Sequence, residues 1–266
     1  VAAFYCDIKM STFMMQTMAS IPGEMLTSGF KADVVSSGIT SISQGEAIFA
    51  GNGQYRLRLR ITRSDDSQIR ITLFGNKIGA PQAVTVKPGT VSLSKSHLKC
   101  HNTEYVRAGD EVYCFVELID EFDNPKGSSL ASSTIEMLVE RDGVEENRFT
   151  NAIYMDVGVY MLTVSSNIAG SVSVKAKYKG SIIDENAVHT LNILPGPASK
   201  ATSVISCPST VLGSVQAVCN LKMKDRFNNP TNFEISKILQ TSIIGPNGVV
   251  PSTLVEGNVF GNYRIL

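Results

Sequence analysis

The chain has 266 residues, of which 43% are hydrophobic and 18% charged, and its 24 basic and 24 acidic side chains cancel. This is ordinary globular composition, with room for two or three domains of about 100 residues. Because the net charge is zero, composition gives no support for binding nucleic acid or for attraction to an acidic membrane. No apolar run approaches the ~18 residues of a membrane helix, so we expect membrane contact only through parts outside this sequence.

The first part of the chain holds one ambiguous segment followed by a clear strand signal. Five of the nine methionines fall between Met10 and Met25, and this segment could be a short helix or an irregular loop. The motif Gly53-Gln-Tyr55 then opens a run in which every second residue is apolar, ending at Ile61. Such alternation is typical of a half-buried strand.

The other face of this strand is basic. Arg56, Arg58 and Arg60 alternate with the apolar residues and therefore share one face. This basic stripe could bind an acidic protein or glycan, although a solvated outer face also accounts for it. No aromatic residues are interleaved with the arginines, so we do not expect nucleic acid as the partner.

The middle of the chain, residues 90–197, is typical of an all-β sandwich. Short apolar runs alternate with Gly-, Asn- and Asp-containing turns, and no long helical period is present. We expect about seven strands, near residues 93–100, 111–119, 133–141, 146–154, 158–166, 171–178 and 187–194.

A twelve-residue motif occurs twice and shows that the chain contains repeats. Cys114–Pro125 reads CFVELIDEFDNP and Cys219–Pro230 reads CNLKMKDRFNNP. In both copies the cysteine is followed by Asp at +6, Phe at +8, Asn at +10 and Pro at +11. An apolar run that stops at such a corner predicts a core strand entering a turn.

Two further motifs give the period of the repeat. The tyrosines of the Gly-x-Tyr motifs, Tyr55, Tyr160 and Tyr263, are 105 and 103 residues apart (160−55, 263−160). The linker-like pairs Pro88-Gly89 and Pro195-Gly196 are 107 residues apart (196−89). We therefore expect three repeats, 1–89, 90–197 and 198–266, of which the first lacks its opening strand and the third its closing strand. The chain would then be part of a longer repeat protein.

The cysteines follow the same period and suggest disulfides. Cys100 and Cys114 are 14 residues apart (114−100), and Cys207 and Cys219 recur at a separation of 12 (219−207). We predict one disulfide within each pair, worth roughly 3 kcal/mol in the chain-entropy model. Cys6 aligns with Cys114 and would be unpaired because its predecessor is missing. Free thiols on neighbouring strands are the alternative, and zinc fits less well because no C-x-x-C is present.

No sequence motif points to catalysis or to a cofactor. The three histidines lie near no nucleophile motif, and neither a phosphate-binding loop nor a dinucleotide fingerprint is present. The acidic residues Asp110, Asp120, Glu121 and Asp123 could suggest calcium. The second copy of the motif keeps only one acid among these, so we expect no metal site and interpret Asp120 and Asn124 as turn-forming side chains.

The order of these motifs resembles the filamin-type immunoglobulin-like repeat. Ala108-Gly109-Asp110 precedes a core strand, followed by the Asp-x-Phe-x-Asn-Pro corner, the Gly-x-Tyr strand and the Pro-Gly-Pro linker. The second and third repeats carry the resemblance best, and the first has Thr12–Thr17 in place of the corner. The resemblance implies tandem immunoglobulin-like β-sandwiches arranged as a rod.

The resemblance and the cysteines together give the expected function. Filamin-type repeats occur in intracellular scaffolds that crosslink the cytoskeleton or dock partner peptides at a sheet edge, and also in ectodomains. Paired cysteines favour an oxidising compartment. We therefore expect a non-catalytic structural or adhesive repeat rod, extracellular or on the cell surface, with protein partners that could include neighbouring copies. An intracellular filamin-like scaffold of the cytoskeleton is the alternative.

Overall fold

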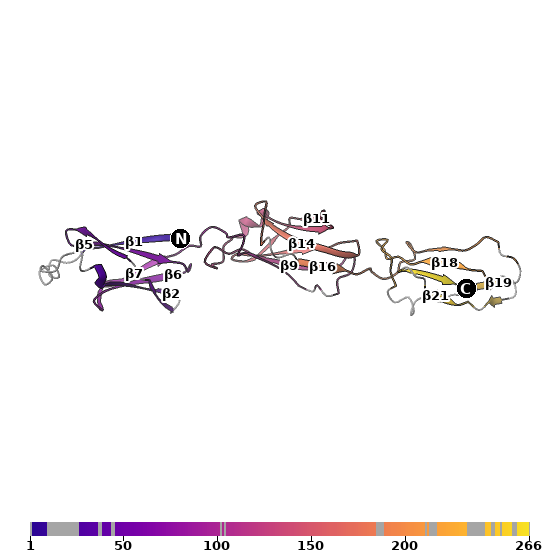
Figure 1. The fold of residues 1–266 in the computed structure, drawn as a ribbon, viewed down its shortest axis with the longest axis horizontal. Helices are drawn as coiled ribbons and strands as arrows, with labels where there is room; N and C mark the ends of the chain where they lie inside the picture. The colour runs from indigo at the N-terminus through magenta and orange to yellow at the C-terminus, as the bar shows by residue number, and fades with distance from the viewer. Residues whose placement is uncertain are drawn as a thin grey trace. The chain divides into compact units, whose positions relative to one another are not determined.

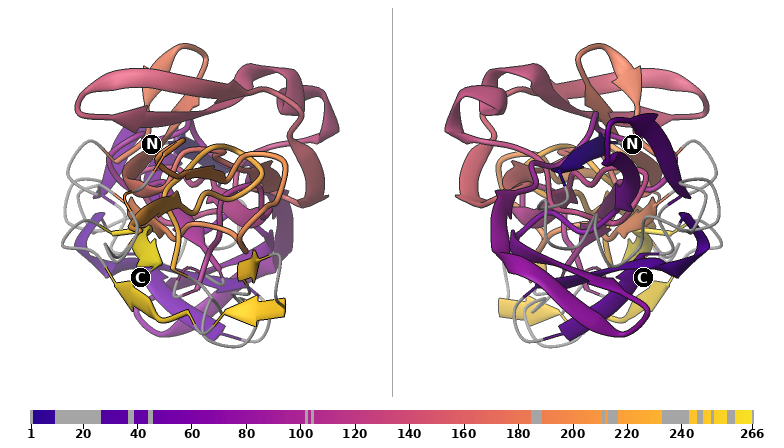
Figure 2. Two further views of the ribbon diagram at one scale, coloured as in Figure 1. Left: turned by 90° about the vertical axis from the view of Figure 1, so that its right-hand side faces the viewer. Right: turned by 90° about the vertical axis from the view of Figure 1, so that its left-hand side faces the viewer.

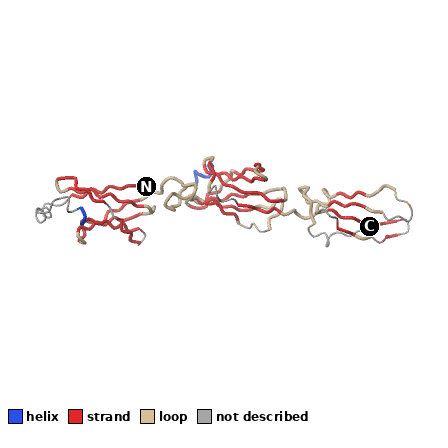
Figure 3. The backbone as a smooth tube through the Cα atoms, viewed as in Figure 1, coloured by secondary structure: helices blue, strands red, loops and turns tan. Residues whose placement is uncertain are grey.

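The structure is a computed structural model of the chain, and the regular secondary structure of the residues it describes is almost entirely β-strand (Figures 1 and 3). It describes residues 2–9, 27–36, 39–43, 46–101, 103, 105–184, 189–210, 212, 217–232, 243–245, 248–250, 252–256 and 260–265. The ambiguous methionine-rich segment Met10–Met25 lies outside the described residues. Within the described part of the chain, no helix is long and apolar enough to span a membrane.

The chain divides into two compact units. The first comprises residues 1–96 with 117–128, and the second comprises residues 97–116 with 129–266. The first unit thus contains the Asp-x-Phe-x-Asn-Pro corner at residues 120–125 together with the first predicted repeat. The division into three repeats with the boundaries given above stays a prediction, and the two units are described separately below.

Two sheets form the sandwich of the first unit. One has the order β1-β5-β4, with β1 at Ala2–Lys9, β4 at Glu46–Gly51 and β5 at Gln54–Ile61. The other has the order β3-β2-β6-β7, with strands Phe30–Ser36 (β2), Ile39–Ser43 (β3), Asp66–Leu73 (β6) and Asn76–Thr85 (β7). A short 3-10 turn, Thr27–Gly29, precedes β2.

The predicted alternation builds the core of this sandwich. Exposed and buried residues alternate along the whole of β5, as its sequence requires. The buried residues of β5 pack with those of β2 and β6, and the rings of Phe30 and Tyr55 meet at 4.7 Å between their centroids. Burial raises the pKa of the Tyr55 hydroxyl. The aromatic contact therefore links the two sheets at the position of the first Gly-x-Tyr motif.

The second unit contains another sandwich. Its first sheet has the order β12-β13-β9-β8, with strands His97–Cys100 (β8), Val112–Glu117 (β9), Ile153–Asp156 (β12) and Val159–Val164 (β13). Its second sheet contains Ile135–Arg141 (β10), Val144–Phe149 (β11), Gly170–Tyr178 (β14), Ser181–Ile182 (β15) and His189–Ile193 (β16). Tyr160 of the second Gly-x-Tyr motif is completely buried. Figure 2 gives two further views of these strands.

Two local predictions for this region are wrong in detail. The strand expected at 146–154 is two strands, because β11 and β12 belong to different sheets. The chain turns between them, where the Ala152 amide donates to the Thr150 carbonyl. In addition, a 3-10 turn, Ser129–Thr134, occupies the beginning of the strand expected at 133–141.

The last part of the chain forms a smaller set of strands. Val204–Ser206 (β17), Cys219–Lys222 (β18), Leu254–Glu256 (β21) and Asn262–Ile265 (β22) make one sheet in the order β17-β18-β22-β21. Ile243–Gly245 (β19) and Gly248–Val250 (β20) pair as a hairpin. Leu221, Met223 and Tyr263 form the buried cluster. The third Gly-x-Tyr motif therefore again supplies a core tyrosine.

Candidate functional site

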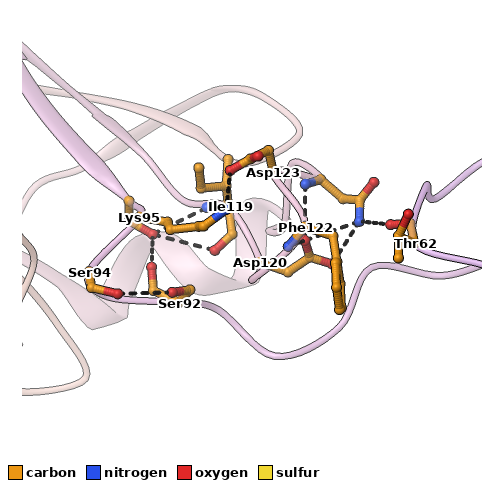
Figure 4. Close-up of polar contacts among 10 residues, drawn as sticks. Thr62, Ser92, Ser94, Lys95, Ile119, Asp120, Phe122 and Asp123 are labelled. Atoms are coloured by element: carbon orange, nitrogen blue, oxygen red, sulfur yellow. Dashed lines mark hydrogen bonds and ion pairs between the residues drawn. The ribbon is translucent and has the colours of Figure 1, made fainter. Parts of the chain in front are cut away.

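The first corner, Asp120–Pro125, is organised by one buried carboxylate (Figure 4). Asp120 is 1% exposed, and its Oδ1 accepts hydrogen bonds from the amides of Phe122 (2.8 Å) and Asn124 (3.0 Å). Its Oδ2 accepts a bond from the amide of Gly89 at 2.8 Å, in the Pro-Gly linker. The carboxylate therefore binds its own turn and the linker together.

Asn124 extends this corner to a loop far away in the sequence. Its Nδ2 group donates to both oxygens of Asp120 and to the Thr62 carbonyl, at 2.7 Å for the latter. Its Oδ1 accepts a bond from the Ser64 amide at 2.8 Å. An asparagine side chain has two donor hydrogens and one acceptor oxygen. Asn124 therefore bonds the carboxylate of its own corner with its donors and bonds the distant loop with a donor and its acceptor. We call residues 62–64 the first acceptor loop.

The second corner, Asp225–Pro230, repeats this arrangement with one fewer bond between the asparagine and the carboxylate. Asp225 is fully buried, and it accepts hydrogen bonds from the amides of Gly196, Phe227 and Asn229 at 2.8, 2.9 and 2.9 Å. Asn229 Nδ2 donates to Asp225 Oδ2 at 2.8 Å and to the Asn167 carbonyl at 2.9 Å. Residues 167–169, the second acceptor loop, complete the set.

The second acceptor loop also donates a bond. The Ala169 amide donates to Asn229 Oδ1 at 3.0 Å, as the Ser64 amide does to Asn124 in the first corner. Both asparagines are more than nine-tenths buried, so these bonds satisfy polar groups that water does not reach freely. Two independent copies of the same bonds indicate that the motif encodes this contact.

Hydrogen bonding controls the charge of both aspartates. Burial on its own would raise the pKa of Asp120, but the bonds from Asn124, Gly89 and Phe122 outweigh it and lower the pKa. The pKa of Asp225 is lowered in the same way, against the effect of burial, by the bonds from Asn229, Gly196 and Phe227. Each corner therefore holds an ionised carboxylate that is fully hydrogen-bonded. The carboxylate oxygens accept amide hydrogens with the same lone pairs that a bound cation would need.

An arginine lies over the ring of the phenylalanine in each corner, but the two arginines come from different parts of the fold. Arg60 Cζ lies 5.5 Å from the centre of the Phe122 ring, and Arg226 Cζ lies 4.5 Å from that of Phe227. Phe227 also packs on Gly109, where a Cβ atom would lie 2.5 Å from ring carbon Cε2. Gly109 has φ of +86°, so both its conformation and its lack of a side chain suit this contact.

The basic stripe lies where the sequence predicts it, on the exposed face of β5. The strand register places Arg56 opposite Asp7 and Ile48, and it places Arg58 opposite Glu46. Arg60 contributes to the first corner through its contact with Phe122, so the stripe is not uniformly available to a separate partner. Its role in binding stays a prediction.

Each of the two cysteine pairs forms a disulfide in the structure. Cys100 and Cys114 form one disulfide, with Cα atoms 4.0 Å apart, and Cys207 and Cys219 form the other, at 4.2 Å. The first disulfide joins the last residue of β8 to β9, and the second joins the residue after β17 to the first residue of β18. Cys6 lies on β1 opposite Leu57, but its side chain lies outside the described residues. Among the described residues, no cluster of side chains suits a metal ion.

The sequence predicts the turn of the corner but not the loop to which the asparagine bonds. The interpretation of Asp120 and Asn124 as turn-forming side chains is correct, because both bond backbone amides or carbonyls. The acceptor loops were missed. The available signal was the asparagine at +10, which both copies keep although the neighbouring acids change.

Comparison with known proteins identifies the fold. No protein-family model matches the chain, and no curated protein matches it. Among solved structures, FdeC, an adhesin of Escherichia coli, matches with a TM-score of 0.54 and 16% identity, over 90% of this chain and 73% of that chain. Invasin, a bacterial integrin-binding protein, matches at 0.47 and 17% identity, over 89% of this chain and 46% of that chain. The Lin-41 filamin domain matches at 0.31 and 19% identity, over 40% of this chain and 97% of that chain.

The match to FdeC and the paired sheets confirm the predicted all-β, immunoglobulin-like fold.

Proposed function

We propose that the chain is a non-catalytic structural or adhesive segment of an extracellular or cell-surface repeat protein. In this proposal, the Asp-Asn corners couple each repeat to the one before it. The adhesin FdeC shares the fold, which agrees with an adhesive role, and the disulfides agree with an oxidising compartment. The partners would be proteins, either other surface proteins or neighbouring copies of this chain.

One observation carries the proposal. Asn229, in the corner of the third predicted repeat, bonds the second acceptor loop, which lies in the second predicted repeat. Asn124 makes the same two bonds in the first unit. A turn that served only its own repeat would not need these two bonds. Coupling of neighbours is what an extended load-carrying or ligand-presenting protein requires, because free rotation at each linker would leave the repeats without a defined order.

Residual dipolar couplings of the whole oxidised chain test the coupling. If the second and third repeats are coupled, their amides fit one common alignment tensor. Asn229→Ala removes both bonds to the acceptor loop, so the two repeats should then need separate tensors. Asn228→Gly, a change of the exposed neighbour whose positive φ glycine accepts, is the matched control and should keep the common tensor. Separate tensors in the unmodified chain would refute the proposed coupling.

Alkylation tests the compartment. Labelling of the purified native-source protein without reduction should leave Cys100, Cys114, Cys207 and Cys219 unmodified. Labelling of all four would instead favour the intracellular scaffold.

A further inference from the structure

One arginine holds the second acceptor loop from inside its own repeat. Arg141 is the last residue of β10, and its Nη2 donates to the Ile168 carbonyl at 2.7 Å. Its Nη1 donates to the carbonyls of Ala169 at 3.2 Å and Ser171 at 3.3 Å. Two carbonyls of the loop and one from the beginning of β14 (Gly170–Tyr178) thus converge on a single guanidinium, whose planar fork can bond several acceptors at once.

Glu146 and Ser166 complete this set of contacts. We call the three side chains, Arg141, Glu146 and Ser166, the brace. Arg141 Nε pairs with Glu146 Oε2 at 3.1 Å, and the two side chains are only 22% and 13% exposed. The other oxygen of Glu146 accepts a bond from the Ser166 hydroxyl, which in turn accepts one from the Ile168 amide at 3.2 Å. Ile168 and Ala169 of the loop are therefore both bonded by side chains of the second repeat.

The Ile168–Ala169 peptide group is shared between the brace and the corner. Its carbonyl accepts from Arg141, and its N–H, which belongs to Ala169, donates to Asn229 Oδ1. A trans peptide is planar and its C=O and N–H point in opposite directions. An arginine that fixes the carbonyl therefore also fixes the direction of the N–H. Hydrogen bonds on both sides of one peptide group also strengthen each other.

The residue after this peptide is suited to the brace as well. Gly170 has φ of +121°, and a Cβ atom there would lie 2.7 Å from Arg141 Nη1. Another residue at this position would be strained by the positive φ and would require the guanidinium to shift.

The first repeat has no arginine at the position that corresponds to Arg141. Arg141 precedes the core tyrosine by 19 residues (160−141), and the same offset in the first repeat gives Ser36 (55−19). Ser36 ends β2 as Arg141 ends β10, so the two positions correspond in the fold. The first acceptor loop makes the same bonds to its corner without a guanidinium at this position.

We propose that Arg141 is a positioning residue for the second corner. It orients the Ile168–Ala169 peptide to receive Asn229 and so sets how firmly the third repeat is coupled to the second. This inference rests on the proposed function, because it assigns a residue to the same coupling.

Amide exchange and dipolar couplings of the whole oxidised chain test this role. Arg141→Gln removes the charge and the fork, and we expect exchange of the Ala169 amide to speed up by about tenfold or more. We also expect the common alignment tensor of the second and third repeats to be lost. Arg148→Gln is the matched control. Arg148 lies in the same sheet and pairs with Glu136 and Glu145, but it does not bond the loop. It should change neither readout.

The outcomes separate this inference from the proposed function. A common tensor that survives Arg141→Gln, with unchanged exchange of Ala169, would refute the role of Arg141 and leave the coupling intact. Separate tensors in the unmodified chain would refute the coupling itself. If Arg141→Gln unfolds the second repeat, Arg141→Lys decides the matter, because lysine keeps the charge beside Glu146 but lacks the fork. Faster exchange of Ala169 in that variant supports the proposal, and unchanged exchange overturns it.

Discussion

Replacement of Asp225 by asparagine tests whether the carboxylate organises the second corner. The substitution keeps the shape and removes the charge. One oxygen remains, which can still accept the two amides of the turn, those of Phe227 and Asn229. The new amide group then faces the Gly196 amide and Asn229 Nδ2, both of which are donors. Two buried donors would therefore lose their acceptor.

The size of the effect follows from these two lost bonds. A hydrogen bond to a charged group contributes about 1.5–3 kcal/mol, and an unsatisfied buried donor costs a similar amount. We therefore expect the corner to lose about 3–6 kcal/mol. Since each 1.4 kcal/mol is roughly a factor of ten, exchange of the Gly196 amide should speed up at least a hundredfold.

Native-state hydrogen exchange of the disulfide-intact chain measures this change. The matched control is Asp123→Asn, because Asp123 is an exposed acid whose pair with Lys95 lies on the surface. Surface pairs contribute about 0–1 kcal/mol, so this variant should change little. If the two variants have the same small effect, the carboxylate does not organise the corner and the interpretation of the motif is wrong.

Three further predictions concern the same contacts. Gly109→Ala should destabilise the second unit by ~1–3 kcal/mol more than Gly180→Ala in chemical denaturation, because both glycines have positive φ but only Gly109 faces a ring. Equal effects would contradict that packing. The lowered pKa values of the corner aspartates, which outweigh the opposing effect of burial, predict that their stabilisation is complete above about pH 4 and is lost as the pH falls through the lowered values. Circular dichroism as a function of pH measures this loss of stability, and the loss should be absent in a variant with asparagine at both positions 120 and 225. Arg60→Ala should weaken the first corner by about 0.5–1 kcal/mol in hydrogen exchange, and Arg58→Ala should not, since only Arg60 is placed over the ring.

The parts of the fold that the sequence predicts well are those that depend on near neighbours. The alternation after each Gly-x-Tyr motif predicts β5 and β13 because the faces of a strand follow from a period of two residues. The turn of each corner is predictable for the same reason, since Asp120 bonds residues two and four positions later. Repetition of the motif gave the approximate period without any structure.

What the sequence could not show depends on distance along the chain. The bonds from Asn124 and Asn229 to the acceptor loops join residues 60 and 62 positions apart, and no local pattern reports such pairs. The strand expected at 146–154 is two strands in different sheets, and sheet membership depends on pairing with strands far along the chain. Arg141 was missed because an arginine at the end of a strand is ordinarily a solvated side chain.

The chemistry of asparagine explains why both copies keep it at the position before proline. The side chain must donate to the carboxylate and to a loop carbonyl, and it must accept from a loop amide. An aspartate at this position could not donate and would face a second buried carboxylate. A leucine of similar volume would leave the loop carbonyl and the loop amide unpaired and would remove one donor from the carboxylate. The neighbouring residues have no such double duty, because Asp123 and Asn228 occupy the left-handed turn position and are exposed. The two copies can therefore differ in their surrounding acids while the aspartate and the asparagine stay, since only these two side chains connect the turn, the linker and the preceding loop.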